Sequence, residues 1–316
     1  MTSFAKSGFS YAGYAAFRPS YPPALFRTVL GFHNAHRTGS PNKTSSPSPS
    51  GTLLDIGCGH GLISRELAPH FAAVTAIDPS AGMVAKAREL TTDPKISVRQ
   101  AGAEDLSFLA DRSVDMAVAG QAAHWFDYKR AWPELARVVK SGGTLAFWGY
   151  KDNILVGYPQ IIPIYFRFVY GGGEVAPGIE GLERFWENPG RSILRDSLQA
   201  VVPPEADWAD VKRIVWDPDR ETGSIEDAPV EALWQRKTLK LGEFEGYLRT
   251  FSSFNNWRAE YPEKKSRAEG GDGDLVDVMF DRFLDAVPEW KALGDKWREF
   301  EVDSVWGTVI LMARRR

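Results

Sequence analysis

Three glycines that alternate with other residues stand directly after an apolar stretch and directly before a helical pattern, in the run DIGCGHG at residues 55–61. Glycine lets the backbone turn tightly and approach a ligand closely. A dinucleotide-binding G-x-G-x-x-G needs its third glycine where this chain has Leu62, and a P-loop needs a Gly-Lys-Ser/Thr that is missing here. The run therefore predicts a cofactor loop of another kind, although a G-x-G-x-G alone also suits a tight turn without a ligand.

The residues around this loop alternate between strand-like and helix-like patterns. Helical spacing of apolar residues and start signals predict helices at 22–36, 62–70, 81–90, 131–139, 241–257 and 274–293. Strands are expected at 52–56, 73–77, 96–100, 114–119, 144–148, 210–216 and 304–312. Such alternation favours an α/β fold with a doubly wound, mostly parallel sheet. We predict a Rossmann-like sheet of seven strands, with an N-terminal helical segment and a helical cap inserted before the last strand.

Composition divides the chain into five parts. Residues 1–37 form an N-terminal helical lid segment, and residues 38–51 are almost entirely Ser, Thr, Pro, Gly and Asn, which predicts a flexible loop. Residues 52–150 form the cofactor-binding core, residues 151–300 a substrate cap that contains the strand near 210–216, and residues 301–316 the last strand and tail.

Charge and cysteine content exclude several classes of protein. The formal net charge is −3 over 316 residues, which gives no broad positive field for nucleic acid or an anionic membrane. One cysteine cannot form an intrachain disulfide or a cysteine metal site. The N-terminus lacks the apolar core of a signal peptide, and no stretch reaches the roughly 20 apolar residues that span a bilayer. We expect a cytoplasmic monomer or homodimer that binds a small molecule but no metal, membrane or nucleic acid.

A second acidic residue completes the predicted cofactor site. Asp78 ends the second strand, 21 residues after Gly57, where a carboxylate accepts both hydroxyls of a ribose. Asp55 suits a ligand that carries an ammonium and a sulfonium better than an anionic pyrophosphate. S-adenosylmethionine fits this pair of acids, whereas the alternative is that Asp78 only caps the following helix.

These motifs resemble the class I S-adenosylmethionine-dependent methyltransferases over residues 50–150. The likeness rests on DIGCGHG, AIDPSAGMV, GAEDL and ELARVVKSGGTLAFWGY. FRPSYP, AHWF, FWENPGRS and LRTFSSFNNW further resemble the fungal trans-aconitate methyltransferase group and extend the likeness over most of the chain. The resemblance implies S-adenosylmethionine as cofactor, S-adenosylhomocysteine as product and methyl transfer to a small molecule.

The resemblance also implies roles for residues at matching positions. Asp55 and the three glycines would line the methionine part, Asp78 would hold the ribose, residues 103–105 would border the adenine, and Gln121 and Ala122 would lie beside the sulfonium. Many relatives have Gly-Asp-Ala where this chain has residues 101–103, a departure at the adenine contact. The full predicted cofactor set is Asp55, Gly57, Cys58, Gly59, Gly61, Asp78, Pro79, Met83, Ala103, Glu104, Asp105, Gln121 and Ala122.

Methyl transfer from a sulfonium is an in-line displacement, so the protein mainly aligns the nucleophile and excludes water. A carboxylate is already ionised at neutral pH and needs a clamp, which arginine forks supply. Arg18, Arg191 and Arg249 lie in family-like motifs, and Arg191 is the preferred clamp; the competing interpretation is that each is a solvated surface residue.

Two further residues are predicted to act in catalysis, Gln121 beside the sulfonium and His124 after the fourth strand. His124 would either accept a proton from a hydroxyl nucleophile, orient a carboxylate or only support its loop. Aromatic rings would enclose the substrate and favour a sulfonium through cation–π attraction, although ordinary core packing accounts for many such rings. The predicted aromatic substrate contacts are Tyr14, Tyr21, Trp125, Trp148 and Tyr150.

The preferred function is an O-methyltransferase that forms a methyl ester on a small carboxylic acid, either trans-aconitate-like or a secondary-metabolite acid. One alternative keeps the cofactor and methylates a hydroxyl, phenol or amine of a secondary metabolite. Another is a protein that binds S-adenosylmethionine without transferring its methyl group. Nucleic-acid methylation is disfavoured because the fourth strand is followed by Gln-Ala-Ala-His rather than an Asn/Asp-Pro-Pro-Tyr/Phe loop.

Overall fold

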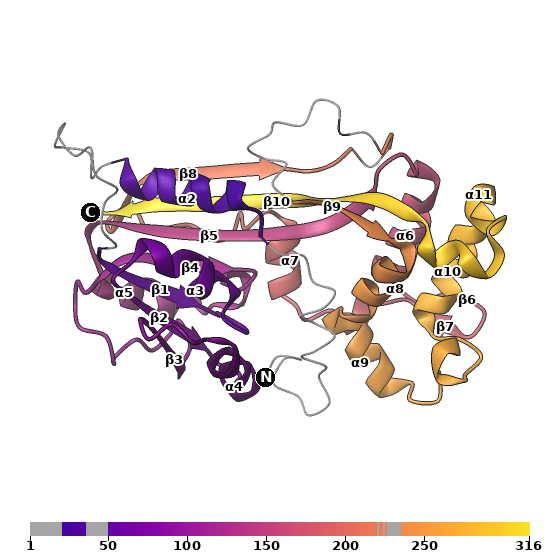
Figure 1. The fold of residues 1–316 in the computed structure, drawn as a ribbon, viewed down its shortest axis with the longest axis horizontal. Coiled ribbons are helices and arrows are strands. Elements are labelled where there is room, and N and C mark those ends of the chain that lie inside the picture. Colours follow the sequence, from indigo (N-terminus) through magenta and orange to yellow (C-terminus); the bar gives the residue numbers. More distant parts are fainter. Residues whose placement is uncertain (1–20, 36–49, 220, 224, 226–234) are drawn as a thin grey trace.

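The computed structural model describes residues 21–35, 50–219, 221–223, 225 and 235–316. Within these residues the main sheet has eight strands in the order β3-β2-β1-β4-β5-β10-β8, with β9 paired to β10 (Figure 1). The first five strands are parallel and β10 is antiparallel to β5, β8 and β9. The strands are β1 (Thr52–Ile56), β2 (Ala73–Asp78), β3 (Ile96–Gln100), β4 (Val114–Gly120), β5 (Val139–Leu155), β8 (Trp208–Trp216), β9 (Arg236–Lys240) and β10 (Glu301–Arg315).

This arrangement confirms the predicted α/β class with a mostly parallel, Rossmann-like sheet. The predicted strand number was one too low, because β9 pairs with the first residues of β10. A separate hairpin is formed by β6 (Glu174–Ala176) and β7 (Ile179–Glu180). The helices are α2 (Pro23–Asn34), α3 (Leu62–Leu67), α4 (Ala81–Leu90), α5 (Tyr128–Val138), α6 (Ile162–Tyr170), α7 (Gly190–Arg195), α8 (Leu241–Arg249), α9 (Ser252–Glu260), α10 (Leu275–Ala286) and α11 (Pro288–Lys291).

Two predicted helices are each divided in the structure. The helix expected at 274–293 ends before Pro288, because proline has no N–H to donate and disfavours a helical conformation in the preceding Val287. The helix expected at 241–257 breaks where the Thr250 hydroxyl bonds the carbonyl of Tyr247 and Phe251 becomes extended. The two breaks turn the cap into a set of short helices.

Alternate residues of the central strands enter two different cores. On β5, Ala146 and Trp148 pack on the side covered by α2 and α3, whereas Leu145 and Phe147 pack on the side covered by α5. This period of two is that of a strand buried on both faces. Both faces of the core sheet are therefore covered.

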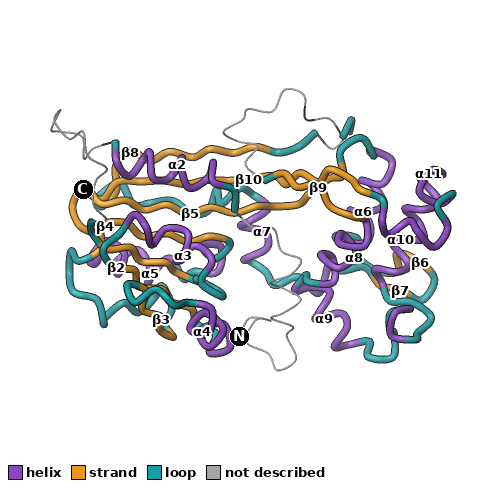
Figure 2. The backbone as a smooth tube through the Cα atoms, viewed as in Figure 1, coloured by secondary structure: helices purple, strands orange, loops and turns teal. Residues whose placement is uncertain are grey.

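β5 and β10 run far beyond the core sheet and carry the cap (Figures 1 and 2). Their antiparallel pairing extends from Thr144 with Arg314 to Leu155 with Ser304. The predicted boundary between residues 150 and 151 falls inside β5, because the polar run Lys151 to Asn153 is buried in the strand. Lys151 donates to Ser197 and Asp217, and Asn153 donates to Ser304. Satisfied hydrogen bonds thus keep polar residues in a buried strand.

Helix α2 is fixed to the sheet at its C-terminal end. The Arg314 guanidinium donates to the carbonyls of Phe32 and His33 and to the Thr144 hydroxyl, which also bonds the His33 imidazole. A cation at a helix C-terminus satisfies its last carbonyls and complements the helix dipole. This anchor places Tyr21, just before the helix, beside the carboxyl end of β4 and against Trp148 and Tyr150 of β5.

Candidate active site

The glycine run joins β1 to α3 in the conformation that its residues require. Gly57, Gly59 and Gly61 all have positive φ, at 68°, 55° and 82°. A Cβ at Gly57 would lie 2.4 Å from the Cβ of Ala122, whereas one at Gly59 would meet no atom within 4 Å. The loop therefore turns tightly against Ala122 and leaves open space beside Gly59.

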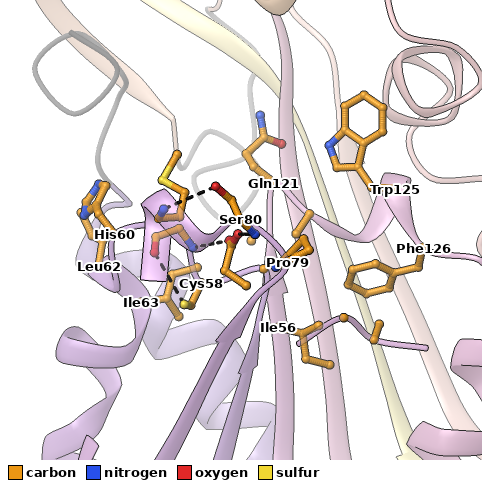
Figure 3. A pocket seen from close by; sticks show the side chains of 18 of the residues that line it. Ile56, Cys58, His60, Leu62, Ile63, Pro79, Ser80, Gln121, Trp125 and Phe126 are labelled. Carbon is orange, nitrogen blue, oxygen red and sulfur yellow. Dashed lines mark hydrogen bonds between the residues drawn. The ribbon is translucent and has the colours of Figure 1, made fainter. Parts of the chain in front are cut away.

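A cavity of about 330 Å³ lies beside this loop, at the carboxyl ends of the parallel strands. Ligands of open α/β sheets bind at this edge, and the volume is that of a small-molecule site. Figure 3 shows Trp125 and Phe126 on the side opposite His60 and Leu62. The lining residues are Tyr21, Ile56, Gly57, Cys58, Gly59, His60, Leu62, Ile63, Asp78, Pro79, Ser80, Met83, Ala101, Gly102, Ala103, Glu104, Gly120, Gln121, Ala122, Trp125, Phe126 and Tyr150.

Asp78 is held rigidly in the wall of this cavity. One carboxylate oxygen accepts the Gly59 N–H at 2.9 Å and the other accepts the Ser80 N–H at 2.8 Å. Burial raises the pKa of Asp78, while these two hydrogen bonds oppose the rise. Ser80, absent from the predicted site, also caps α4 through the Met83 N–H, which its position after Pro79 could have indicated.

Three predicted cofactor residues do not line the cavity. Asp55 lies beneath the loop, fully buried, where the Ser64 hydroxyl donates to one of its oxygens at 2.5 Å; the other oxygen has no partner among the described residues. Burial raises the pKa of Asp55 to about 7. Gly61 caps α3, and Asp105 is exposed and accepts the Ser107 N–H.

One wall of the cavity is formed by Ala103 and Glu104, after β3. Ala103 is buried, and Glu104 accepts the Asp127 N–H, which joins this wall to the start of α5. Met83 and Phe126 add apolar surface. Flat apolar walls beside a hydrogen-bonding carboxylate suit a nucleoside.

At the opposite end, hereafter the transfer end, the lining residues are Tyr21, Gln121, Ala122, Trp125 and Tyr150. The Gln121 amide bonds both the N–H and the carbonyl of Tyr150. The Tyr21 ring lies edge-on to Trp148, with centroids 5.8 Å apart, and is tilted against Tyr150 at 6.5 Å. Trp148 itself is buried below the cavity and does not line it.

His124 is buried just behind the transfer end. Its ring lies 4.8 Å from that of Trp125, and its Nδ1 atom has no hydrogen-bond partner among the described residues. Burial, with a contribution from the nearby Arg191 guanidinium, lowers the pKa of His124 to about 3. The imidazole is therefore neutral at neutral pH.

The arginines predicted as clamps occupy different places. Arg191 lies at the start of α7, which packs against Trp125, and it bonds Asp152 and the Tyr170 hydroxyl while its guanidinium covers the Trp186 ring at 4.3 Å. Neither Arg191 nor Arg249 lines the cavity. Arg18 and Tyr14 lie outside the described residues.

Arg249 is occupied within the cap. Its guanidinium bonds both oxygens of Asp274 at 3.0 Å, Glu245 at 2.8 Å, and an oxygen of Asp277 at 3.0 Å. These three carboxylates together contact all three nitrogens of the guanidinium, and Asp274 is fully buried. Its place in this ion-pair network gives Arg249 a packing role within the cap.

Over the described residues, no group of three or more potential metal-ligating side chains was found. Over the same residues, none of the helices is both long and apolar enough to cross a bilayer.

The fold and cavity are those of a nucleoside-binding α/β enzyme, and comparisons with known proteins specify the family. A methyltransferase-domain model matches residues 54–147. The chain is 28% identical over its full length to the Saccharomyces cerevisiae protein named Probable S-adenosylmethionine-dependent methyltransferase CRG1, of which it covers 99%. It is 30% identical over 88% of its length to a candidate methyltransferase of Dictyostelium discoideum, of which it covers 93%.

Among solved structures, a candidate type II methyltransferase from Anaeromyxobacter dehalogenans is similar to 95% of this chain and 98% of its own, with a TM-score of 0.60 and 27% identity. The chain therefore belongs to the class I S-adenosylmethionine-dependent methyltransferases. The glycine loop, the pinned Asp78 and the apolar wall fit that cofactor, because they offer close backbone approach, a carboxylate for a ribose and flat surface for a base.

Proposed function

We propose that this methyltransferase forms a methyl ester on a small carboxylic acid, of the trans-aconitate type that its motifs resemble. The observation that supports this is the composition of the transfer end. Its described lining residues include no carboxylate and no imidazole, and the nearby His124 is too weak a base, with a pKa of about 3. A hydroxyl nucleophile needs a proton acceptor, whereas a carboxylate does not.

The charged residues near the transfer end also favour a carboxylate as the nucleophile. At the junction of core and cap, Arg191 and Arg195 face a single buried carboxylate, Asp152. Tyr170 bonds Asp152 through its hydroxyl, and the pKa of Tyr170 is raised, first of all by burial, so this phenol adds no negative charge. The cluster thus carries one excess positive charge, which favours an anionic substrate.

In the proposed reaction, bound S-adenosylmethionine supplies an electrophilic methyl group on a sulfonium. Asp78 and the glycine loop hold the nucleoside end, and the aromatic residues Tyr21, Trp125 and Tyr150 exclude water at the transfer end. The step neutralises both the reacting carboxylate and the sulfonium, so a water-poor, apolar cavity favours it. The acid is held by the side chains of the transfer end and needs no deprotonation.

The test is incubation of purified protein with methyl-labelled S-adenosylmethionine and a panel of mono-, di- and tricarboxylic acids that includes trans-aconitate. Base-labile label on an acid, with release of S-adenosylhomocysteine, supports the proposal. Label transferred only to phenols, alcohols or amines would replace the carboxylate by those acceptors. Cofactor binding without any transfer would favour a non-transferring role.

A further inference from the structure

Where the pairing of β4 with β5 ends, the side chain of Gln121 takes the place of a neighbouring strand's backbone. Pairing of β4 with β5 ends at Gly120 and Trp148, and the next residue, Gln121, has a φ of 54° that takes the chain away from the sheet. The Gln121 side-chain oxygen accepts the Tyr150 N–H at 3.1 Å, and its nitrogen donates to the Tyr150 carbonyl at 3.0 Å. A primary amide thus makes the two hydrogen bonds that a neighbouring peptide would make.

Room for this amide comes from Gly149. A Cβ at that position would lie 2.6 Å from the Gln121 side-chain oxygen and 2.7 Å from Leu194. Contacts this short essentially never occur, so any larger residue at 149 would displace the amide. The pair Gln121 and Gly149 therefore holds the backbone of Tyr150 in one place at the cavity wall.

The direction of the Tyr150 side chain is set by its ring contacts. Its ring packs against Tyr21 at 6.5 Å and against Trp306 at 6.4 Å, and the residue lines the transfer end. Its hydroxyl forms no hydrogen bond with any described residue, although the side chain is almost wholly buried. A hydroxyl on a residue that lines a cavity, and that no described residue bonds, is available to a ligand.

We infer that Tyr150 orients the methyl-accepting group by donating a hydrogen bond from its hydroxyl to one carboxylate oxygen, and that Gln121 is a positioning residue that acts through Tyr150. This inference rests on the proposed function. The second carboxylate oxygen forms the new bond to the methyl carbon while the bond from that carbon to sulfur breaks, and the electron pair stays on sulfur. No proton is transferred.

A double-mutant cycle separates this role from simple support of the strand end. Tyr150→Phe removes only the hydroxyl, and Gln121→Leu removes both amide bonds at similar size. We expect each variant to lower kcat/KM for the accepted acid about tenfold, the value of one lost hydrogen bond to a charged group, and the double variant to be little worse than either. Affinity for S-adenosylhomocysteine should stay unchanged, and the exposed Gln199→Leu should behave as wild type.

Multiplied losses, about 100-fold in the double variant, would overturn the coupling, since independent sites add in free energy. Gln121→Glu keeps the acceptor for the Tyr150 N–H but loses the donor, and it replaces Gln121→Leu if that variant is poorly folded. If the same non-additive losses in kcat/KM occurred with a phenol or an amine as methyl acceptor, Gln121 would still position Tyr150, but the carboxylate would not be the accepting group.

A second measurement is independent of substrate. With 3-fluorotyrosine incorporated, the ¹⁹F resonance lost in Tyr150→Phe identifies Tyr150. Gln121→Leu should move that resonance, and Gln199→Leu should not. An unmoved resonance would show that Gln121 does not position Tyr150, whichever acceptor the enzyme uses.

Discussion

The two ends of the cavity are built by different means. At the glycine loop, the shape is set by backbone: three residues with positive φ, and two N–H groups that hold Asp78. At the transfer end, it is set by side chains that come from separate segments, including Tyr21 before α2, Gln121 after β4 and Tyr150 on β5. Cofactor recognition thus depends on local geometry, and acceptor recognition on tertiary packing.

The largest effect is expected from Gly57→Ala, which adds a single methyl group to the glycine loop. In Gly57→Ala, the added carbon meets Ala122 at 2.4 Å at a φ of 68°. We expect a loss of about 3 kcal/mol, or 100-fold and more in affinity for S-adenosylhomocysteine measured by calorimetry. Gly142→Ala is the matched control, because Gly142 has a φ of 74° with no atom near its Cβ position. Equal losses in both variants would attribute the effect to backbone strain alone.

A smaller effect is expected at the acid of the same region. Asp78→Asn places an amide nitrogen against one of two N–H donors and removes the ionic acceptor for a ribose. Affinity for S-adenosylhomocysteine should fall about 10- to 100-fold, or about 1.4–3 kcal/mol. Asp93→Asn controls for the turn geometry, since Asp93 likewise accepts an N–H two residues on, from Lys95. An Asp78→Asn variant that binds normally would remove the carboxylate from cofactor recognition.

Two arginines test the transfer side of the comparison. Arg191→Gln removes the excess positive charge of the cluster around Asp152, and we expect KM for the acid to rise about tenfold while cofactor affinity holds. Arg249→Lys weakens a network around the buried Asp274 and should lower the free energy of unfolding by about 1–3 kcal/mol without changing KM. Steady-state kinetics beside urea unfolding distinguishes them, and the opposite pattern would exchange their roles.

Burial of Asp55 gives the protein a specific pH dependence. Its pKa is about 7 in the folded state, above the ordinary aspartate value of 3.8, so the folded protein binds more protons than the unfolded chain between these two pH values. The stability that Asp55 contributes is present below about pH 4 and lost as the pH rises to 7, with a slope of about 1 kcal/mol per pH unit. Subtracting urea unfolding of Asp55→Asn from that of wild type at each pH should reveal this slope. A flat difference would indicate a normal pKa.

The smallest effect is expected at Cys58. Although the thiol lies in the cofactor loop, it is buried, and burial raises its pKa well above the usual value. Cys58→Ser should change methyl transfer less than about twofold, and the wild-type thiol should react slowly with Ellman's reagent at pH 8. Rapid labelling that S-adenosylhomocysteine prevents would instead show an accessible, reactive thiol.

The same contrast explains what could be predicted from sequence. Spacing alone located β1, α4 and β3 to the residue and placed Gly57, Gly59 and Asp78 around one cavity, because these contacts are local. The sequence predicts Arg249 as a substrate-binding residue, because no local pattern shows that its guanidinium bonds Asp274, 25 residues further along the chain. Gln121 was expected beside the sulfonium, but its hydrogen bonds to Tyr150 depend on a pairing across 29 residues, which no local pattern reports.

The long ribbon of β5 and β10 has a mechanical consequence. The pairing of β5 with β10 runs from Arg314 in the core to Ser304 beside the cap. The cap is therefore joined to the core by two paired strands of the main sheet rather than by a loop. The register between β5 and β10 shifts around Gly307, between Trp306 and Thr308, near where pairing of β10 with β8 gives way to pairing with β9. Because a bulge locally interrupts the ladder and increases its twist, we expect any bending of the cap relative to the core to be concentrated there.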